Sequence, residues 1–334
     1  MKVVIYGAGS IGCYIGAILH LEQINVHLLG RARVQQNIER AGAIFISDYE
    51  ERNDKAENVP FSCHPEVLTD ADVVLVTLKC TAMENAIAEL QSFCSPSALV
   101  VCLQNGVGVQ QKVQQALPQH NVLSGIVPFN VVQTEAHFHR ATEGGLHFPI
   151  HSSLLPLQAA FQAYGLGCQL NSNIEEVIWG KLLLNLNNAI NALSDIPLKE
   201  QLSKRSYRLV LAACQREMLR LCKHNNIKPA KLTAVAPHWI PTILSLPDWL
   251  FAIVAQKMLA IDPTARSSMW EDLQQGRATE IDYLNGAVVA LAEKSGIAAP
   301  ANKMVSQWIT SLTNASGRNA VSGEALLQAL QEPS

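Results

Sequence analysis

The sequence predicts an α/β protein with two domains, in which a doubly wound parallel sheet is followed by an all-helical domain. Short apolar runs alternate with helix-like segments in the first half of the chain, a pattern typical of parallel strands joined by crossover helices. After residue 172 helical periodicity dominates, so we place the domains at residues 1–172 and 173–334. A length of 334 residues suits two domains of about 150 residues each.

The predicted strands of the first domain are short and rich in β-branched residues. They cover Lys2–Tyr6, Val26–Leu29, Asp72–Leu78, Ala98–Leu103 and Val122–Val127, and a helix is expected at Ile11–Leu21. Continuous apolar runs such as DVVLVTL are typical of parallel strands that are covered on both faces.

Beyond residue 130 we expect an antiparallel addition at the edge of the sheet. Segments Asn130–His139 and Gly145–His151 flank the sequence TEGG at 142–145, which is interpreted as a hairpin turn. One last strand of this domain is expected around Cys168–Leu170.

The second domain is predicted to consist of helices. Their approximate ranges are 173–195, 200–225, 230–245, 248–261, 264–276, 279–296 and 300–313, with prolines near several boundaries. Thr279 is the expected N-cap of the helix at 279–296, with Asp282 as the acid of a capping box. Residues 316–334 suggest a loop and a short terminal helix.

Composition excludes several classes of protein. Hydrophobic residues make up 49% of the chain and the net charge is -3, which suits a buried globular core and gives no basic excess for binding nucleic acid. We expect no membrane span, because no apolar run approaches about 18 residues, and no targeting segment. Eight cysteines without a CxxC pair favour reduced thiols in a cytoplasmic protein.

No metal site is predicted. The pairs His137/His139 and His147/His151 have spacings that would suit a metal, but they lack carboxylate or cysteine companions. A solvated strand face explains these histidines better.

A glycine-rich motif of the GxGxxG type joins the first predicted strand to the first predicted helix. It comprises Gly7, Ala8, Gly9, Ser10, Ile11 and Gly12. The first glycine permits a tight turn, the second lets a pyrophosphate approach the backbone, and the third lets helix and strand pack closely. The helix N-terminus then faces the phosphates. We therefore predict a dinucleotide site; the alternative is a glycine-rich turn without a ligand.

The end of the second predicted strand favours NADPH over NADH. An NAD site usually places an acidic residue about 20 residues after the glycines, but no Asp or Glu occurs between Gln23 and Ile38. Arg31 stands there instead, and a guanidinium can bind the 2′-phosphate with two hydrogen bonds. Arg33 is either a second contact or a solvated charge.

Two further polar residues follow predicted strands. Lys79 comes directly after Asp72–Leu78, and Asn105 comes shortly after Ala98–Leu103. Ligands of open α/β sheets bind beyond the carboxyl ends of strands, so both are candidate ligand contacts. The alternatives are a surface lysine and an Asn-Gly turn.

A polar stripe interrupts a leucine-rich helix in the second domain. Lys181, Asn185 and Asn188 share one helical face. Because burying unpaired amides and an ammonium is costly, this stripe either faces a polar cleft or bonds to neighbouring helices. A desolvated lysine beside a cofactor can act as a general acid.

Several motifs occur together in chain order. They are the glycine loop, VTLK at 76–79, QNGVG at 104–108, WGKL with Asn185 at 179–185, and SSM with TEID at 267–282. This ordered set resembles the ketopantoate reductase (2-dehydropantoate 2-reductase) family over residues 1–313. The resemblance implies a Rossmann-type domain, a helical domain like the C-terminal domain of 6-phosphogluconate dehydrogenase, and a site in the cleft between them.

The resemblance also implies a reaction, the NADPH-dependent reduction of 2-dehydropantoate to (R)-pantoate on the route to pantothenate and coenzyme A. Arg31 and Lys79 match residues that contact NADPH, and Asn105 matches a residue near both nicotinamide and substrate. Lys181 matches the general acid. Glu280 matches a catalytic carboxylate that bonds the substrate hydroxyl and lies near the cofactor.

The implied substrate is a small 2-oxo acid. Asn185 and Ser268 match substrate-binding positions of the family, and Asn188 of the polar stripe joins Asn105 and Lys181 in the predicted substrate-binding set. Family members occur as monomers and as dimers, so a homodimer is one expected assembly.

The chain departs from the family pattern in three places. Ala189 stands where a second asparagine is usual, no further asparagine occurs at 195–199, and the region 237–265 is longer than expected. A related NADPH-dependent reductase of another 2-oxo acid is therefore an alternative. A non-catalytic NADP-binding sensor is another, although a sensor has no need of a proton donor.

Overall fold

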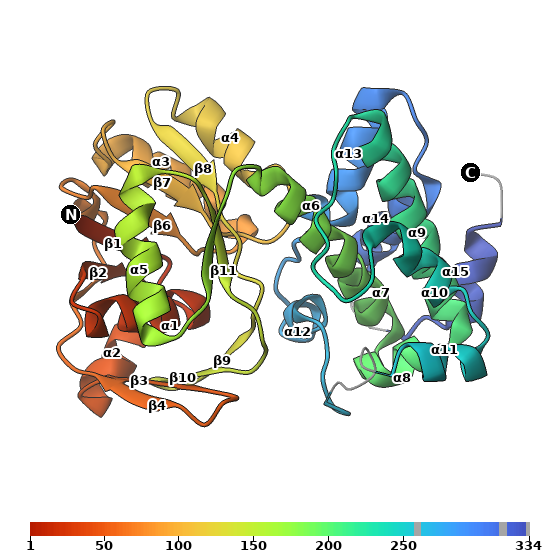
Figure 1. Cartoon of the computed structure of the whole chain (residues 1–334), viewed down its shortest axis with the longest axis horizontal. Coiled ribbons are helices and arrows are strands. Elements are labelled where there is room, and N and C mark those ends of the chain that lie inside the picture. Colours follow the sequence, from red (N-terminus) through yellow and green to blue (C-terminus); the bar gives the residue numbers. More distant parts are fainter. Residues whose placement is uncertain (257–261, 314–318, 332–334) are drawn as a thin grey trace. The chain divides into compact units, whose positions relative to one another are not determined.

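The protein, shown as a computed structural model in Figure 1, divides into two compact units at residues 1–174 and 175–334. The structure describes residues 1–256, 262–313 and 319–331. The two units are taken in turn.

A six-stranded parallel sheet forms the centre of the first unit, in the order β5-β2-β1-β6-β7-β8. Its strands are β1 (Lys2–Tyr6), β2 (Asn25–Leu29), β5 (Phe61–Ser62), β6 (Val73–Val76), β7 (Leu99–Cys102) and β8 (Asn121–Ser124). Every pairing in this sheet is parallel, which confirms the predicted doubly wound architecture.

Helices cover both faces of this sheet, as the apolar runs predict. They are α1 (Ser10–Leu21), α2 (Ala32–Ala41), α3 (Met83–Phe93), α4 (Val109–Ala116) and α5 (Leu155–Tyr164), with short 3-10 turns η1 (Pro65–Leu68), η2 (Cys80–Ala82) and η3 (Ser152–Leu154). Alternate strand residues such as Val3, Ile5 and Leu75 join the buried side chains of α1 and α5 in one hydrophobic cluster. The next residues along the strands, such as Val4 and Val74, are also fully buried.

The antiparallel hairpin lies elsewhere than predicted. It joins β9 (Val131–Thr134) to β10 (His137–Arg140) through Glu135, whose φ of 54° makes the turn. These strands extend a four-stranded sheet in the order β4-β3-β10-β9, with β3 at Ile44–Asp48 and β4 at Asn53–Ala56. The prediction of a hairpin turn at residues 142–145 was therefore wrong.

The residues of the TEGG sequence instead lead the chain away from β10. Gly144, with φ of 124°, precedes β11 (Leu146–Pro149), and β11 pairs in parallel with β12 (Cys168–Asn171). The last predicted strand of this unit is thus present, but its partner is β11 and not the main sheet. A turn signal alone does not say which strands it joins.

The second unit is helical, as predicted. Its helices are α6 (Ile174–Asn185), α7 (Asn187–Ser194), α8 (Leu198–Ser203), α9 (Arg205–His224), α10 (Ile240–Leu244), α11 (Asp248–Val254), α12 (Ser268–Gln274), α13 (Asn285–Ser295), α14 (Pro300–Thr313) and α15 (Gly323–Ala329), with 3-10 turns η4 (Pro237–Trp239) and η5 (Ile281–Tyr283). The long helix α9 is central: its neighbours include α7, α8, α10, α13, α14 and α15. Its residues Val210, Ala212, Met218 and Leu221 have no exposed surface.

Several predicted helices are shorter than the periodicity suggested. The helix expected at 173–195 is two helices separated at Leu186, and the one expected at 230–245 is helical only from Pro237 onward. The apolar pattern continues through the break at Leu186 because both flanking helices contribute buried side chains. Residues 230–236, by contrast, are exposed or half-buried. The helix expected at 248–261 ends at Val254, and residues 257–261 lie outside the described part of the chain.

The helix boundaries near the predicted site also differ. The helix expected at 264–276 begins at Ser268, because the side chain of Ser267 caps it by accepting a hydrogen bond from the Trp270 N–H. The predicted capping role of Thr279 was wrong: Glu280 immediately precedes the 3-10 turn η5, and α13 starts only at Asn285. In the described ranges, no helix has the length and apolarity needed to cross a membrane.

Candidate functional site

The glycine motif forms a tight turn between β1 and α1. Gly7 has φ of 113°, a conformation that favours glycine, and a Cβ there would lie 2.6 Å from the Leu78 backbone nitrogen. A Cβ on Gly12 would lie 2.4 Å from the Gly7 carbonyl oxygen. Thr77 secures this turn, since its Oγ1 donates a hydrogen bond to the Gly7 carbonyl at 2.8 Å.

The residues of this turn fit a dinucleotide. A Cβ added to Gly9 would meet nothing closer than the Gly7 carbonyl oxygen at 3.9 Å, so one side of the loop is open at that residue. Gly9 is the N-cap of α1, and the first turn of this twelve-residue helix carries no acidic side chain. Backbone N–H groups at a helix start with no competing carboxylate can receive a pyrophosphate.

Arg31 lies at the end of β2, beside the glycine loop. The backbone N–H groups of Gly7 and Ala8 both donate to the Leu29 carbonyl at 2.9 Å, and a Cβ on Gly30 would lie 2.7 Å from that of Ala8. The side chains of Arg31 and Arg33 are both exposed at the start of α2. Either guanidinium can therefore reach solvent near the loop, and the two interpretations of Arg33 stay open.

Lys79 and Asn105 follow β6 and β7 at the same edge of the sheet as the glycine loop. This placement results from the parallel order β1-β6-β7, which aligns the carboxyl ends of the three strands. The Cys80 thiol donates to the Asn105 carbonyl oxygen at 3.4 Å and links the two segments. The first unit thus gathers the predicted cofactor residues of three strands along one edge.

Lys181 and Glu280 are coupled electrostatically within the second unit. Lys181 lies on α6, and burial lowers the pKa of its ammonium to about 8, while the charge of Glu280 opposes this shift by raising it. Glu280 is half-buried just before η5. The structure therefore pairs the predicted general acid with the predicted catalytic carboxylate, although about a hundred residues separate them in the chain.

The polar stripe is divided between two helices. Lys181 and Asn185 belong to α6, and Asn188 belongs to α7 beyond the break at Leu186. Asn185 and Asn188 are both partly exposed, whereas Ala189 has no exposed surface. Position 189, where the family usually has an asparagine, therefore faces the core in this chain. The neighbouring Asn188 is the partly exposed asparagine of this helix turn.

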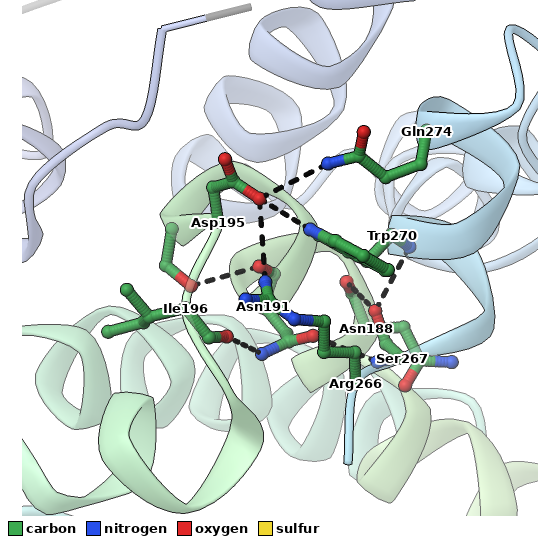
Figure 2. A network of polar contacts seen from close by, with 9 residues as sticks. Asn188, Asn191, Asp195, Ile196, Arg266, Ser267, Trp270 and Gln274 are labelled. Carbon is green, nitrogen blue, oxygen red and sulfur yellow. Dashed lines mark hydrogen bonds and ion pairs between the residues drawn. The ribbon is translucent and has the colours of Figure 1, made fainter. Parts of the chain in front are cut away.

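Ser268 is the exposed first residue of α12, and the segment before it is tied to α7 (Figure 2). The Ser267 hydroxyl donates to the Asn188 carbonyl at 3.0 Å, and the Ser267 N–H donates to the Asn191 side-chain oxygen at 2.9 Å. Two predicted substrate residues, Asn188 and Ser268, are thus brought close together through Ser267.

Sequence reasoning missed three residues that shape these sites. Thr77 secures the glycine turn, while Asn191 and Asp195 hold the start of α12. A threonine near the end of the predicted strand Asp72–Leu78 was a local signal for the first. Asn191 and Asp195 carry no such signal, because their partners lie more than seventy residues away.

The candidate histidines serve local contacts. His137 Nε2 and His139 Nδ1 each lie 2.9 Å from the Ser47 hydroxyl on the adjacent strand, and His151 Nδ1 accepts from the Ser153 N–H at 3.2 Å. Throughout the described ranges, no cluster of three or more His, Cys, Asp or Glu side chains is arranged to hold a metal.

Two family models match the chain. The model described as ketopantoate reductase PanE/ApbA matches residues 3–153, and the model described as ketopantoate reductase PanE/ApbA C terminal matches residues 173–313. The 2-dehydropantoate 2-reductase of Halobacterium salinarum is 25% identical over 307 residues, which cover 90% of this chain and 95% of that protein.

Solved structures show the same architecture. A PanE/ApbA family ketopantoate reductase from Ralstonia eutropha JMP134 superposes with a TM-score of 0.79 at 27% identity, covering 94% of this chain and 99% of that one. A D-mandelate dehydrogenase, solved with NADH and anilino(oxo)acetate, has a TM-score of 0.76 at 21% identity over 94% of this chain and 99% of its own. The latter shares the fold.

Proposed function

Because the chain belongs to the ketopantoate reductase family, whose members are NAD(P)-dependent oxidoreductases, we propose that it reduces 2-dehydropantoate to (R)-pantoate with NADPH. In this proposal residues 1–172 bind the cofactor and residues 173–334 carry the substrate and the proton donor. The observation that carries it is the pairing of a half-buried lysine, Lys181, with a carboxylate, Glu280.

The residues of the first unit are proposed to bind NADPH. The open side of Gly9 and the start of α1 receive the pyrophosphate, and Arg31 binds the 2′-phosphate. Lys79 and Asn105 contact the cofactor from the ends of β6 and β7. Bound there, the reduced nicotinamide supplies the hydride for the carbonyl carbon.

Lys181 is proposed to supply the proton. Its ammonium donates to the carbonyl oxygen of the 2-oxo acid as the carbonyl carbon is reduced, so that the oxygen becomes a hydroxyl and the lysine a neutral amine. A cation next to the developing alkoxide stabilises the transition state more than the ketone. A pKa of about 8 suits this transfer, because the group is still mostly protonated at neutral pH but releases its proton readily.

Glu280 has two roles in this proposal. Its negative charge raises the pKa of Lys181 and so keeps the lysine protonated before reaction. Its carboxylate also accepts a hydrogen bond from a substrate hydroxyl. Uncharged polar side chains, those of Asn185, Asn188 and Ser268, bind the rest of the acid.

A panel of 2-oxo acids assayed by oxidation of NADPH tests this function. The proposal expects the highest kcat/KM with 2-dehydropantoate. A clear preference for another acid, such as one with an aromatic side chain, would favour the related reductase, which the buried Ala189 keeps as the second candidate. Tight NADPH binding without oxidation for any acid would support the sensor.

The proposed setting is the cytoplasm, with a homodimer as the proposed assembly. All eight cysteines remain thiols and seven of them are buried, which supports a reducing environment. Light scattering of the purified protein tests the assembly: a monomeric mass across the micromolar range would overturn the homodimer.

A further inference from the structure

Hydrogen bonds among Asn191, Ile196 and Ser267 connect the C-terminal end of α7 to the N-terminal end of α12 (Figure 2). We call this cluster the polar joint. Its central residue is Asn191, which has no exposed surface. The Asn191 amide donates to the Ile196 carbonyl at 2.9 Å, and its oxygen accepts from the Ser267 N–H at 2.9 Å. One side chain therefore satisfies a buried backbone N–H and a half-buried backbone carbonyl on two different segments.

Replacing the amide side chain of Asn191 should destabilise the fold. Asn191 supplies one donor and one acceptor in opposite directions, which an apolar side chain cannot do. Its loss leaves the buried Ser267 N–H and the half-buried Ile196 carbonyl without these partners, and a buried unpaired group is strongly unfavourable. The segment that precedes α12 is thus fixed by a contact that tolerates few substitutions.

Asp195 also binds α12, through side chains on its more exposed side. Its Oδ1 accepts from the Trp270 indole N–H at 2.6 Å and lies 3.4 Å from a guanidinium nitrogen of Arg266. Gln274 donates to the same oxygen at 3.4 Å. Asp195 has φ of 53°, so the chain turns sharply at the end of α7 and directs this carboxylate toward α12.

We propose that Asn191 is a positioning residue that acts through Ser268, by holding the start of α12 where the Ser268 hydroxyl contacts the 2-oxo acid. The inference rests on the proposed function, which makes Ser268 a substrate contact. Asp195 supports the same placement from outside.

The predicted consequence is a loss of substrate affinity with little loss of turnover. Lys181 lies on α6, before the break at Leu186, whereas the hydrogen bonds of Asn191 start from α7. Glu280 immediately precedes η5, which packs against α13 and α14. A hydrogen bond from Asn285 to Asn302 ties these two helices together. Loosening the start of α12 therefore leaves the proton donor and its carboxylate held by other contacts.

A double-mutant cycle tests whether Asn191 acts through Ser268. We expect Asn191→Ala to raise the KM for the 2-oxo acid about tenfold, with kcat within about twofold and an unchanged Kd for NADPH. In the Ser268→Ala background the same substitution should change KM by no more than about twofold, because the contact it positions is already gone. A merely structural role predicts equal effects in both backgrounds, and that result overturns the inference.

A second variant covers the case in which Asn191→Ala does not fold. Asp195→Gly removes the carboxylate but suits the positive φ, so the backbone turn is kept. It should also raise KM, by about threefold, and again not in the Ser268→Ala background. An unchanged KM would count against the inference.

Ser194→Ala is the matched control. Ser194 is also buried on α7, but its hydroxyl donates within the helix, to the Asn191 carbonyl at 2.9 Å. Its KM should stay at the wild-type value; a rise as large as that of Asn191→Ala would mean that any loosening of α7 has this effect. If the wild-type protein reduces no 2-oxo acid, the proposed function fails first, and the inference with it.

Discussion

Burial of Lys181 lowers its pKa to about 8, and the negative charge of Glu280 limits the size of that shift. The two residues come from α6 and from the segment before η5, and the helical unit brings their charges within interacting range. This opposition keeps the lysine charged at neutral pH while making its proton easier to release. The pair is therefore the feature whose perturbation is most informative.

The pH profile of turnover should report this pair. Lys181 must be protonated to act, so kcat should fall as the pH rises through about 8. Glu280→Gln removes the charge that raises the pKa of Lys181, so the descending limb should move to lower pH. Steady-state assays from pH 5.5 to about 9.5 locate the descending limb of the wild type and of the variant.

Glu271→Gln is the control for this prediction. Glu271 is an exposed carboxylate on α12, and its removal should leave the limb in place. A profile for Glu280→Gln that superposes on that of the wild type would remove Glu280 from its role toward Lys181.

Replacing Lys181 should separate activity from stability. We expect Lys181→Met to lower kcat by ~10²–10⁴-fold with the Kd for NADPH nearly intact, since the proton donor is lost. The same change should raise Tm by a few degrees at pH 7, because the native state no longer holds a charge that burial disfavours.

The sign of the pH dependence follows from the direction of the shift. The native lysine loses its proton near pH 8 and the unfolded one near 10.5, so the wild type gains stability relative to Lys181→Met between these values. Thermal unfolding at pH 7 and pH 10 measures this. A stability difference that does not narrow with rising pH would contradict a lysine with a lowered pKa.

Arg31 should discriminate between the two cofactors. Arg31→Ala is expected to weaken NADPH binding roughly tenfold or more, while NADH binding barely changes, because only NADPH carries the 2′-phosphate. Arg40→Ala, at the other end of α2 and also exposed, is the matched control. Fluorescence titration with both cofactors measures the ratio, and equal losses for NADPH and NADH would exclude Arg31 from the phosphate site.

Arg33→Ala decides between the two interpretations of that residue. A selective loss of NADPH affinity would make Arg33 a second phosphate contact. An unchanged affinity would make it a solvated charge.

Two glycines of the loop should respond differently to alanine. Gly12→Ala places a methyl group 2.4 Å from the Gly7 carbonyl oxygen and 2.7 Å from Thr77 Oγ1, so it should destabilise the fold by a few kcal/mol. Gly9→Ala meets nothing within 3.4 Å and should leave Tm unchanged, yet weaken NADPH binding because the methyl group occupies the open side of the loop. Wild-type cofactor affinity in a folded Gly9→Ala protein would argue against a pyrophosphate there.

Much of the first unit was predictable from local patterns. The glycine loop lies between β1 and α1, and the apolar runs became the central strands, because parallel strands buried on both faces need continuous apolar sequence. Which strands pair with one another was harder to predict. The strand β10 pairs with β3 as well as with β9. Pairing with β3 depends on the packing of segments that lie more than ninety residues apart in the chain.

The helical unit shows a similar division. Its helical character was predictable from periodicity, but the break at Leu186 was not, because the apolar pattern continues on both sides of it. The capping prediction failed at Thr279 because Ile281–Tyr283 form a separate 3-10 turn and α13 starts only at Asn285.

The sequence by itself determined the kinds of group available: a glycine loop for a phosphate, Arg31 without a neighbouring acid, and a lysine in a leucine-rich helix. These are local properties, set by residue type and spacing. Only the tertiary structure decided that Glu280 acts on Lys181 and that Asn191 holds Ser267. Electrostatic coupling and hydrogen bonding depend on distance in space, which the packing of helices distant in the chain creates.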